Sequence, residues 1–177
     1  LAALAEGGAR TPTEGSLVGM LSACAPSRNA DLAERILDWA MLRSRCTLPV
    51  FSAAAKVMIA AKRHDRICEA YEAVEAECGL ELDDVCYGQV IRCAVQVGRL
   101  ALARRLSQKA KNPDAQNTAS LIRACGQEGD VRQAMTLLWE LHHRGEADTA
   151  AFNSALDVAV SGGDRDAART IFEEMKA

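Results

Sequence analysis

Seven cysteines and three histidines are the side chains of this sequence that could bind a metal, form disulfides or act as nucleophiles. No two cysteines form a CxxC pair, and the nearest two, Cys86 and Cys93, are seven residues apart. An odd number of cysteines scattered through helical segments is typical of reduced thiols that pack as small apolar residues. We therefore expect no metal site here, and a surface role for His64, His142 and His143.

Sequence motifs of known catalytic chemistry are absent as well. The chain has no glycine-rich phosphate loop after a strand, no HExxH and no nucleophile elbow. It also lacks the HxE…CxxC pattern of zinc deaminases, and its aspartates stand at segment ends rather than in a cluster of metal ligands. The sequence predicts a chain that is not an enzyme, with no catalytic residue, no cofactor and no small-molecule substrate.

The segments that hold these residues form a repeat. Residues 149–177 are predicted to form two helices separated by Gly162 and Gly163, with Asp164 as the N-cap of the second. Each helix has an apolar stripe at helical spacing that its own hairpin cannot bury. The same pattern recurs at intervals of 34, 36, 31 and 34 residues. An aromatic residue, or a residue that replaces it, opens each first helix: Leu17, Phe51, Tyr87, Thr118 and Phe152.

A glycine or polar break follows each first helix, and an apolar run then forms the second helix. The breaks are at 27–29, 62–63, 98–99, 129–130 and 163–164. A fixed period of this length, filled by a helix–turn–helix, is typical of an α-solenoid in which each repeat buries the face of its neighbour. We predict an all-α fold, a solenoid of about five stacked hairpins that forms one array without separate domains.

Composition sets further bounds on the function. The 177 residues are 49% hydrophobic and 25% charged, which suffices for a core, and the net charge is −3. That charge is unfavourable for a protein that follows a phosphate backbone. No apolar run reaches the roughly 20 residues that span a bilayer, so we expect no membrane partner. The first ten residues resemble the end of a preceding second helix, which predicts a piece of a longer array.

The last repeat carries the residues of a known family. Its sequence FNSALDVAVSGGDRDAARTIFEEMK resembles the pentatricopeptide repeat (PPR), in which an aromatic–Asn pair opens the first helix, a glycine marks the turn and an ALxLFxEM-like run fills the second helix. The tetratricopeptide repeat is the alternative, but its WxxLGxxY signature is absent from every first helix. The resemblance implies a right-handed superhelix, with a partial repeat at 1–13 and repeats at 14–47, 48–83, 84–114, 115–148 and 149–177.

The resemblance also implies that the first helices bind single-stranded RNA, about one base per repeat. In the family the base is chosen by the residue after the first-helix aromatic together with the last residue of the same repeat. Carried over to this chain, the pairs are Val18 with Thr47, Ser52 with Asp83, Gly88 with Asp114 and Ala119 with Asp148, and Asn153 opens a fifth pair.

These positions differ in what they offer a base. Only Ser52 with Asp83 looks like a standard combination, which the family's rules associate with a purine, guanine in particular. Asn153 suits a pyrimidine. Val18, Gly88 and Ala119 offer no side-chain hydrogen bond and are expected to be permissive, which argues against strict sequence recognition by this chain.

Three basic residues are the predicted phosphate contacts. The lysine that the family carries near the end of the first helix is missing from every repeat here. One turn after the base-reading position, however, Lys56, Arg92 and Arg123 share its helix face by i, i+4 spacing. The alternative is that they are ordinary solvated charges on a first helix.

Two functions therefore remain open from the sequence. The first is single-stranded RNA binding, with a role in RNA processing, stability or translation in a mitochondrion or chloroplast, as the family resemblance implies. The second is a degenerate helical-repeat scaffold that binds protein partners, for instance within a ribonucleoprotein. The acidic net charge and the blank base-reading positions favour the second function.

Overall fold

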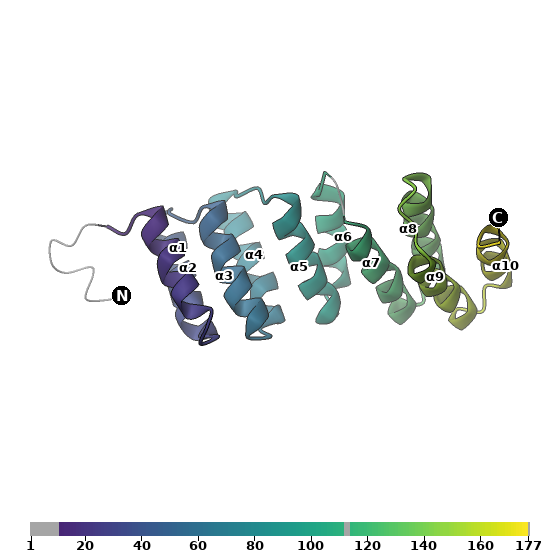
Figure 1. Cartoon of the computed structure of the whole chain (residues 1–177), viewed down its shortest axis with the longest axis horizontal. Coiled ribbons are helices and arrows are strands. Elements are labelled where there is room, and N and C mark those ends of the chain that lie inside the picture. The colour runs from purple at the N-terminus through teal and green to yellow at the C-terminus, as the bar shows by residue number, and fades with distance from the viewer. Residues whose placement is uncertain (1–10, 112–113, 177) are drawn as a thin grey trace. The chain divides into compact units, whose positions relative to one another are not determined.

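The computed structural model describes residues 11–111 and 114–176, and these form ten α-helices and no β-strand (Figure 1). The partial repeat predicted at 1–13 lies largely outside the described residues. The helices are α1 (Glu14–Cys24), α2 (Ala30–Leu42), α3 (Leu48–Ala60), α4 (His64–Cys78), α5 (Asp84–Gln96), α6 (Leu100–Lys109), α7 (Ala115–Glu128), α8 (Val131–His143), α9 (Thr149–Ser161) and α10 (Arg165–Glu174).

Each odd-numbered helix is joined to the next helix by the same turn. One residue in it has a left-handed backbone: Arg28 (φ 50°), Lys62 (59°), Gly98 (77°), Gly129 (70°) or Gly163 (73°). The next backbone N–H donates to the carbonyl five residues earlier, as in Asp164 to Ala159 at 2.9 Å. This bond gives a helix end carbonyl a partner. The turns lie at the predicted breaks, and Asp164 caps α10 as predicted by accepting the Ala167 N–H at 3.0 Å.

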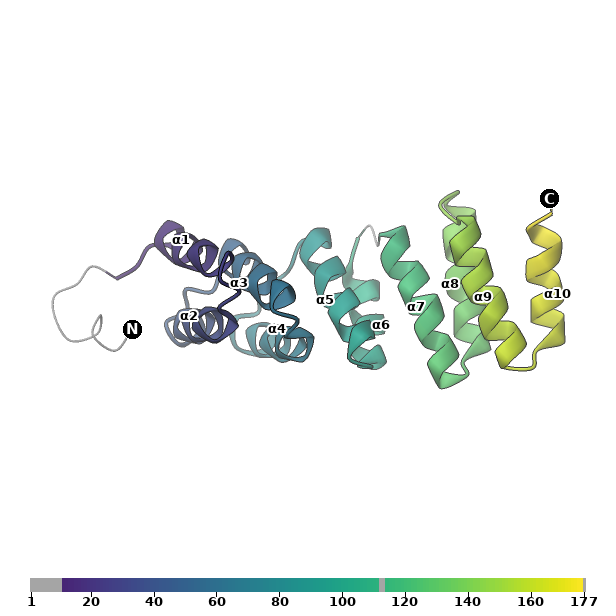
Figure 2. The ribbon, with the colours of Figure 1, turned by 60° about the horizontal axis from the view of Figure 1, so that its bottom comes forward.

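Two compact units make up the chain, the first up to Cys93 and the second from Ala94. In the first unit α1 packs on α3 and α2 packs on α4, so the first helices form one layer and the second helices the other (Figure 2). Leu17, Phe51, Ile67 and Tyr71 are buried between the layers. Full burial of such a side chain stabilises the fold by about 1.5–3 kcal/mol, so the layers are held together mainly by these contacts.

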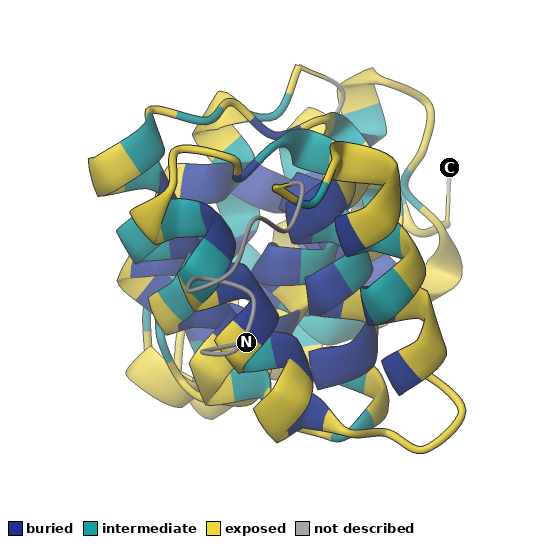
Figure 3. Cartoon of the chain, turned by 90° about the vertical axis from the view of Figure 1, so that its left-hand side faces the viewer, coloured by how far each residue is buried: buried dark blue, intermediate teal, exposed yellow. Residues whose placement is uncertain are grey.

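In the second unit α7 packs against α6, α8 and α9, and α9 packs against α10. Leu106, Ile122, Leu138 and Ile171 are buried in its core. The first helices α7 and α9 approach closely at Gly126, where an added Cβ would lie 3.0 Å from Val158 Cγ2. In each unit, buried positions lie where helices meet and exposed positions lie on the outside and in the turns (Figure 3).

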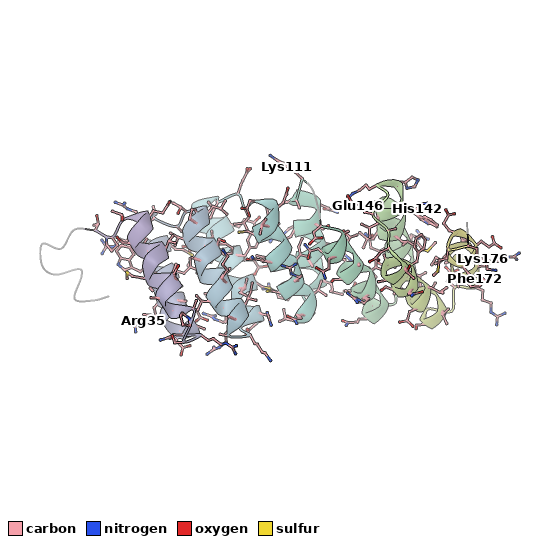
Figure 4. All side chains as sticks on the ribbon, viewed as in Figure 1. Arg35, Lys111, His142, Glu146, Phe172 and Lys176 are labelled. Atoms are coloured by element: carbon pink, nitrogen blue, oxygen red, sulfur yellow. The ribbon has the colours of Figure 1, made fainter. Side chains whose placement is uncertain are left out.

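Some residues of the predicted apolar stripes in the last repeat are not buried. Val160 is 63% exposed and Phe172 50% exposed, and Met175 is exposed as well. Helix α10 contacts α9, and Ile171 is its one fully buried residue among those described. Lys176 covers part of Phe172, with its ammonium 4.1 Å from the centre of the ring (Figure 4).

The predicted fold class is confirmed. The described residues are all-α, and the chain is a helical-repeat solenoid built from helix–turn–helix units. A repeat of this kind positions its first helices side by side, as α1 and α3 are in the first unit and α7 and α9 in the second. The candidate site is therefore sought along the first helices.

Candidate nucleic-acid interface

A groove of about 340 Å³ runs between α1 and α3. Leu17 and Phe51 anchor these helices and are fully buried. Since successive helical residues are turned by roughly 100°, the residues that follow these anchors, Val18 and Ser52, face the groove and line it together with Lys56. The structure thus brings two predicted base-reading positions and one predicted phosphate contact into a single groove.

The predicted pair Ser52 and Asp83 meets at the thiol of Cys86, in the first turn of α5. Both side chains influence the pKa of this thiol, and the Asp83 carboxylate accepts the Cys86 backbone N–H at 2.7 Å. Burial raises the pKa of the Cys86 thiol to about 11, while Ser52 and the charge of Lys56 act to lower it. The thiol is therefore protonated at neutral pH and interacts with both side chains of the pair.

Lys56 and Arg92 are exposed on α3 and α5 in the first unit. The positive charge of Lys56 acts to lower the pKa of the Cys86 thiol. That of Arg92 acts to lower the pKa of the neighbouring Cys93 thiol, although burial raises this pKa to about 12. Both cations thus combine an exposed position with a place on a first helix. Their contact with phosphate remains a prediction.

The other positions of the first unit carry little hydrogen-bonding chemistry. Val18 is half-buried in the groove. Its predicted partner Thr47 is the N-cap residue of α3 without a side-chain capping bond, and its hydroxyl oxygen is buried without a hydrogen-bond partner among the described residues. Gly88 is buried within α5. The expectation that Val18 and Gly88 are permissive positions stays a prediction.

In the second unit the predicted readers lie on α7 and α9. Ala119 is half-buried on α7, Arg123 is exposed one turn further along, and Asn153 is exposed on α9. Asp148 stands at the start of α9, where its carboxylate accepts the Ala151 N–H at 2.7 Å. An exposed amide and an exposed guanidinium on first helices could each contact a nucleotide.

The three aspartates that end repeats are all helix N-caps. Asp83, Asp114 and Asp148 each accept a backbone N–H from the first turn of the helix that follows. Such a cap stabilises a helix by about 1 kcal/mol, which explains the carboxylates without any ligand. Each capping bond occupies one carboxylate oxygen, so the second oxygen can still accept from a base or a neighbouring side chain.

Sequence reasoning missed Cys86 as the residue that joins Ser52 to Asp83. A signal exists in the repeat, because the residue directly before the first-helix aromatic or its replacement is buried in the last four repeats, at Val50, Cys86, Asn117 and Ala151. A polarisable thiol at that position can reach side chains from both the preceding first helix and the preceding loop. The spacing alone could not show that the two meet there.

The described residues hold no group of three or more His, Cys, Asp or Glu side chains placed to bind a metal ion. All seven cysteines are free thiols, and all but Cys78 are buried. In the same part of the chain, every helix is too short or too polar to cross a membrane. His142 keeps 40% of its side chain exposed, and it also packs 5.7 Å from the Phe152 ring with its Nε2 3.2 Å from a Glu174 carboxylate oxygen (Figure 4).

Comparison with known proteins gives one matching repeat and one similar fold. Residues 119–146 match the family model of the PPR repeat. The fold is similar to the crystal structure of the pentatricopeptide repeat protein PPR10 from maize, with a TM-score of 0.54 and 21% sequence identity over 90% of this chain and 29% of that chain. The chain thus spans less than a third of the length of PPR10. No curated protein sequence matches it. One repeat of this chain, at residues 119–146, thus matches the PPR repeat, and the chain shares the helical-repeat fold of a pentatricopeptide repeat protein.

Proposed function

We propose that this chain binds single-stranded RNA along its first helices. The observation that carries the proposal is the groove between α1 and α3, which Val18, Ser52 and Lys56 line together. It offers an apolar wall, a hydroxyl and a cation to one nucleotide. Single-stranded bases are recognised by this combination of stacking or apolar contact, hydrogen bonding at the base edge and phosphate contact.

Ser52 and Asp83 are the best-equipped base-reading pair. A hydroxyl can donate to or accept from the Watson–Crick edge of a base, and a carboxylate accepts from an amino group. Guanine carries both an N1–H and an N2 amino group as donors and O6 as an acceptor, so it matches the pair. The backbone N–H of Cys86 restrains the Asp83 carboxylate before RNA arrives, which lowers the entropy cost of binding.

Lys56, Arg92 and Arg123 are proposed to contact phosphates. Each such contact in a single-strand complex contributes about 0.7 to the slope of log affinity against log salt concentration. Binding of the 177-residue chain to a pool of single-stranded RNA is measured by fluorescence anisotropy between 50 and 500 mM salt. The variant Lys56→Gln should weaken binding of all sequences and reduce the slope.

Arg132→Gln is the matched control. Arg132 is exposed on α8, a second helix, so this variant removes the same charge from outside the proposed path of the RNA. Equal losses from Lys56→Gln and Arg132→Gln would show that only net charge matters and would contradict the proposed groove. Failure of the unmodified chain to bind any member of the pool would contradict RNA binding itself.

The second candidate function, a scaffold for protein partners, is favoured by the charge of α4. Glu69 and Glu77 are exposed on this second helix, and Glu72 and Glu75 are partly exposed. An acidic second-helix face suits a basic protein partner better than RNA. A stable partner that co-purifies with the chain after ribonuclease treatment, and that is lost when Glu69 and Glu77 are replaced by Gln, would favour the scaffold over RNA binding.

We extend the proposal to RNA processing, stability or translation in a mitochondrion or chloroplast. The support is the match of residues 119–146 to the PPR repeat, because RNA binding by PPR proteins is linked to organelles. Subcellular fractionation of cells that express the native gene product tests the location. Recovery of the protein outside both organelles would contradict this extension and leave the RNA-binding groove unaffected.

A further inference from the structure

A second, more polar cleft lies at the edge of the first unit where the turns of its two complete hairpins meet. It has a volume of about 540 Å³ and is lined by residues 27–31 and 60–63. Three of its side chains are basic, Arg28, Lys62 and Arg63, and one is acidic, Asp31. Asp31 pairs with Arg63 at 3.1 Å. Neither Arg28 nor Lys62 has an ion pair within the described part of the chain, so the cleft has an excess of positive charge.

Arg28 and Lys62 occupy a backbone position where any residue other than glycine is unfavourable. They are the left-handed residues of their turns, with φ of 50° and 59°, and the three later hairpins have glycine at the same place. Left-handed backbone is costly for residues with a Cβ and costs glycine almost nothing. An outlier of this kind motivates a search for function. Here both strained positions send a cation into the same cleft.

The cleft continues the groove between α1 and α3. The groove is lined as far as Ala25 on one side and Lys56 and Val57 on the other. The cleft begins at Ser27 and at Ala60, which is one helical turn beyond Lys56 on α3. A strand whose bases occupy the groove therefore reaches the cleft with its next backbone unit.

The ends of two helices add to the positive potential there. Helices α2 and α4 both start at the cleft. Asn29 caps α2 by accepting the Leu32 N–H at 3.1 Å, whereas Arg63 at the N-cap of α4 makes no side-chain capping bond. Helix N-termini carry partial positive charge and favour anions. This field reinforces the cations but does not by itself define a site.

We propose that this cleft, through Arg28, Lys62 and Arg63, binds the phosphodiester backbone of single-stranded RNA that leaves the groove. The identification of the strand rests on the proposed RNA-binding function, whereas the affinity of the cleft for a phosphodiester does not. The lysine at the end of the first helix is missing from every repeat, and in the first two repeats the turn cations supply phosphate contacts in its place. They lie outside the base-reading positions and contribute affinity without sequence preference.

The test uses an abasic ribose–phosphate oligomer, which presents the backbone without bases, and the full 177-residue chain. The variant carries Arg28→Gly and Lys62→Gly together. Glycine suits the left-handed backbone of both turns, so the melting temperature of the double variant should not fall below that of the unmodified chain. Loss of two phosphate contacts should lower the salt slope by about 1.4. If the two proteins bind equally at 1 M salt, the variant then binds about 25-fold more weakly at 0.1 M.

Two controls match the variant in backbone and in charge. Ser44 also has a left-handed backbone, with φ of 53°, so Ser44→Gly makes the same backbone change without removing a charge. Arg43→Gln with Arg45→Gln removes two positive charges at the opposite end of α2. Both controls should bind the abasic oligomer as the unmodified chain does. An equal loss in the Arg43 and Arg45 variant, or an unchanged slope in the glycine variant, would overturn the proposal.

The outcomes separate the cleft from the groove. If RNA with bases binds no better than the abasic oligomer, and the glycine variant weakens both, the base-reading groove is contradicted and the cleft is supported. If RNA binds and the glycine variant binds both probes normally, the groove stands and the cleft is contradicted. Binding of an aspartate-rich peptide of equal charge, as tight as that of the oligomer and equally weakened in the variant, would contradict the assignment to a phosphodiester.

Discussion

The guanidinium of Arg66 on α4 lies 3.4 Å from the carboxylate of Glu34 on α2. One turn earlier on both helices, Arg63 and Asp31 form the same contact at 3.1 Å. Each pair is separated by 32 residues in the sequence. Ion pairs with a common offset thus join the second helices of neighbouring hairpins and fix their relative position along the helix axes.

The variant Glu34→Gln should lower the free energy of unfolding by about 0.5–1 kcal/mol, because the contact is partly exposed and such pairs contribute little. A double-mutant cycle with Arg66→Gln, measured by urea unfolding, isolates the pairwise part. Glu34 is the more buried partner, with 17% of its side chain exposed. A coupling energy of zero would show that the pair neither stabilises the fold nor fixes the helices, and would contradict the prediction.

Stability should fall above pH 9. Burial raises the pKa of the Cys46 and Cys93 thiols to about 12 and that of Cys86 to about 11, from an ordinary value of 9.0. Between pH 9 and 11 the unfolded chain therefore loses protons that the folded chain keeps, so rising pH favours unfolding. Each thiol contributes a limiting slope of about 1.4 kcal/mol per pH unit.

The measurement is urea unfolding between pH 7 and 10.5. Lysine and tyrosine also titrate in this range, so the control is Cys93→Ala, which removes one buried thiol and should make the decline less steep. An identical pH profile for the variant would show that other groups cause the loss of stability.

Gly162 should not tolerate alanine. Its backbone is not left-handed, but an added Cβ would lie 2.4 Å from Val131 Cγ2 and 3.1 Å from the Val158 carbonyl oxygen. Overpacking of this kind costs about 1–3 kcal/mol. Gly19→Ala is the control, because nothing lies within 4 Å of the new methyl group in α1, and alanine in a helix should stabilise by up to about 1 kcal/mol. Thermal unfolding of both variants gives the comparison, and Val131→Ala should partly rescue Gly162→Ala.

A second base-reading pair can be built on the same pattern. Ala119 corresponds to Ser52, and Asp148 corresponds to Asp83 as the last residue of its repeat. The variant Ala119→Ser should therefore gain a preference for guanine at one position of a bound RNA. A hydrogen bond to an uncharged partner contributes about 1 kcal/mol, which is roughly a fivefold change in affinity. Binding to RNAs that differ at single positions measures the gain.

Ser52→Ala is the reciprocal variant and should lose a preference of the same size in the first unit. If neither substitution changes the ranking of the four bases, the pairs do not read bases, and any RNA binding depends on the backbone alone.

The hairpin turns could be predicted from the sequence because they depend on local chemistry. Gly163 supplies the left-handed residue and Asp164 supplies the cap, and both are recognisable without knowing what surrounds them. Lys62 takes the same backbone role without being glycine, and it was located only because the period of the repeat points to it.

Contacts between repeats could not be predicted in the same way. Periodicity places Val160 and Phe172 on an apolar stripe, but which part of the stripe is covered depends on the neighbouring helix, and both are exposed. The meeting of Ser52 and Asp83 at Cys86 joins residues from two repeats, and spacing along the chain gives no distance between them. The pairing of His142 with Glu174 is of the same kind.

The repeated turn has a consequence for engineering. Each hairpin turn depends on backbone hydrogen bonds and on one residue with positive φ, and five different turn sequences form this same turn. The side chain at that joint is therefore a free attachment point, one per repeat, on the same edge of each hairpin. A cysteine placed at Gly129 or Gly163, in a background without reactive thiols, would carry a dye or crosslinker at a modest cost in stability. Such labels would report, repeat by repeat, where a bound strand enters and leaves.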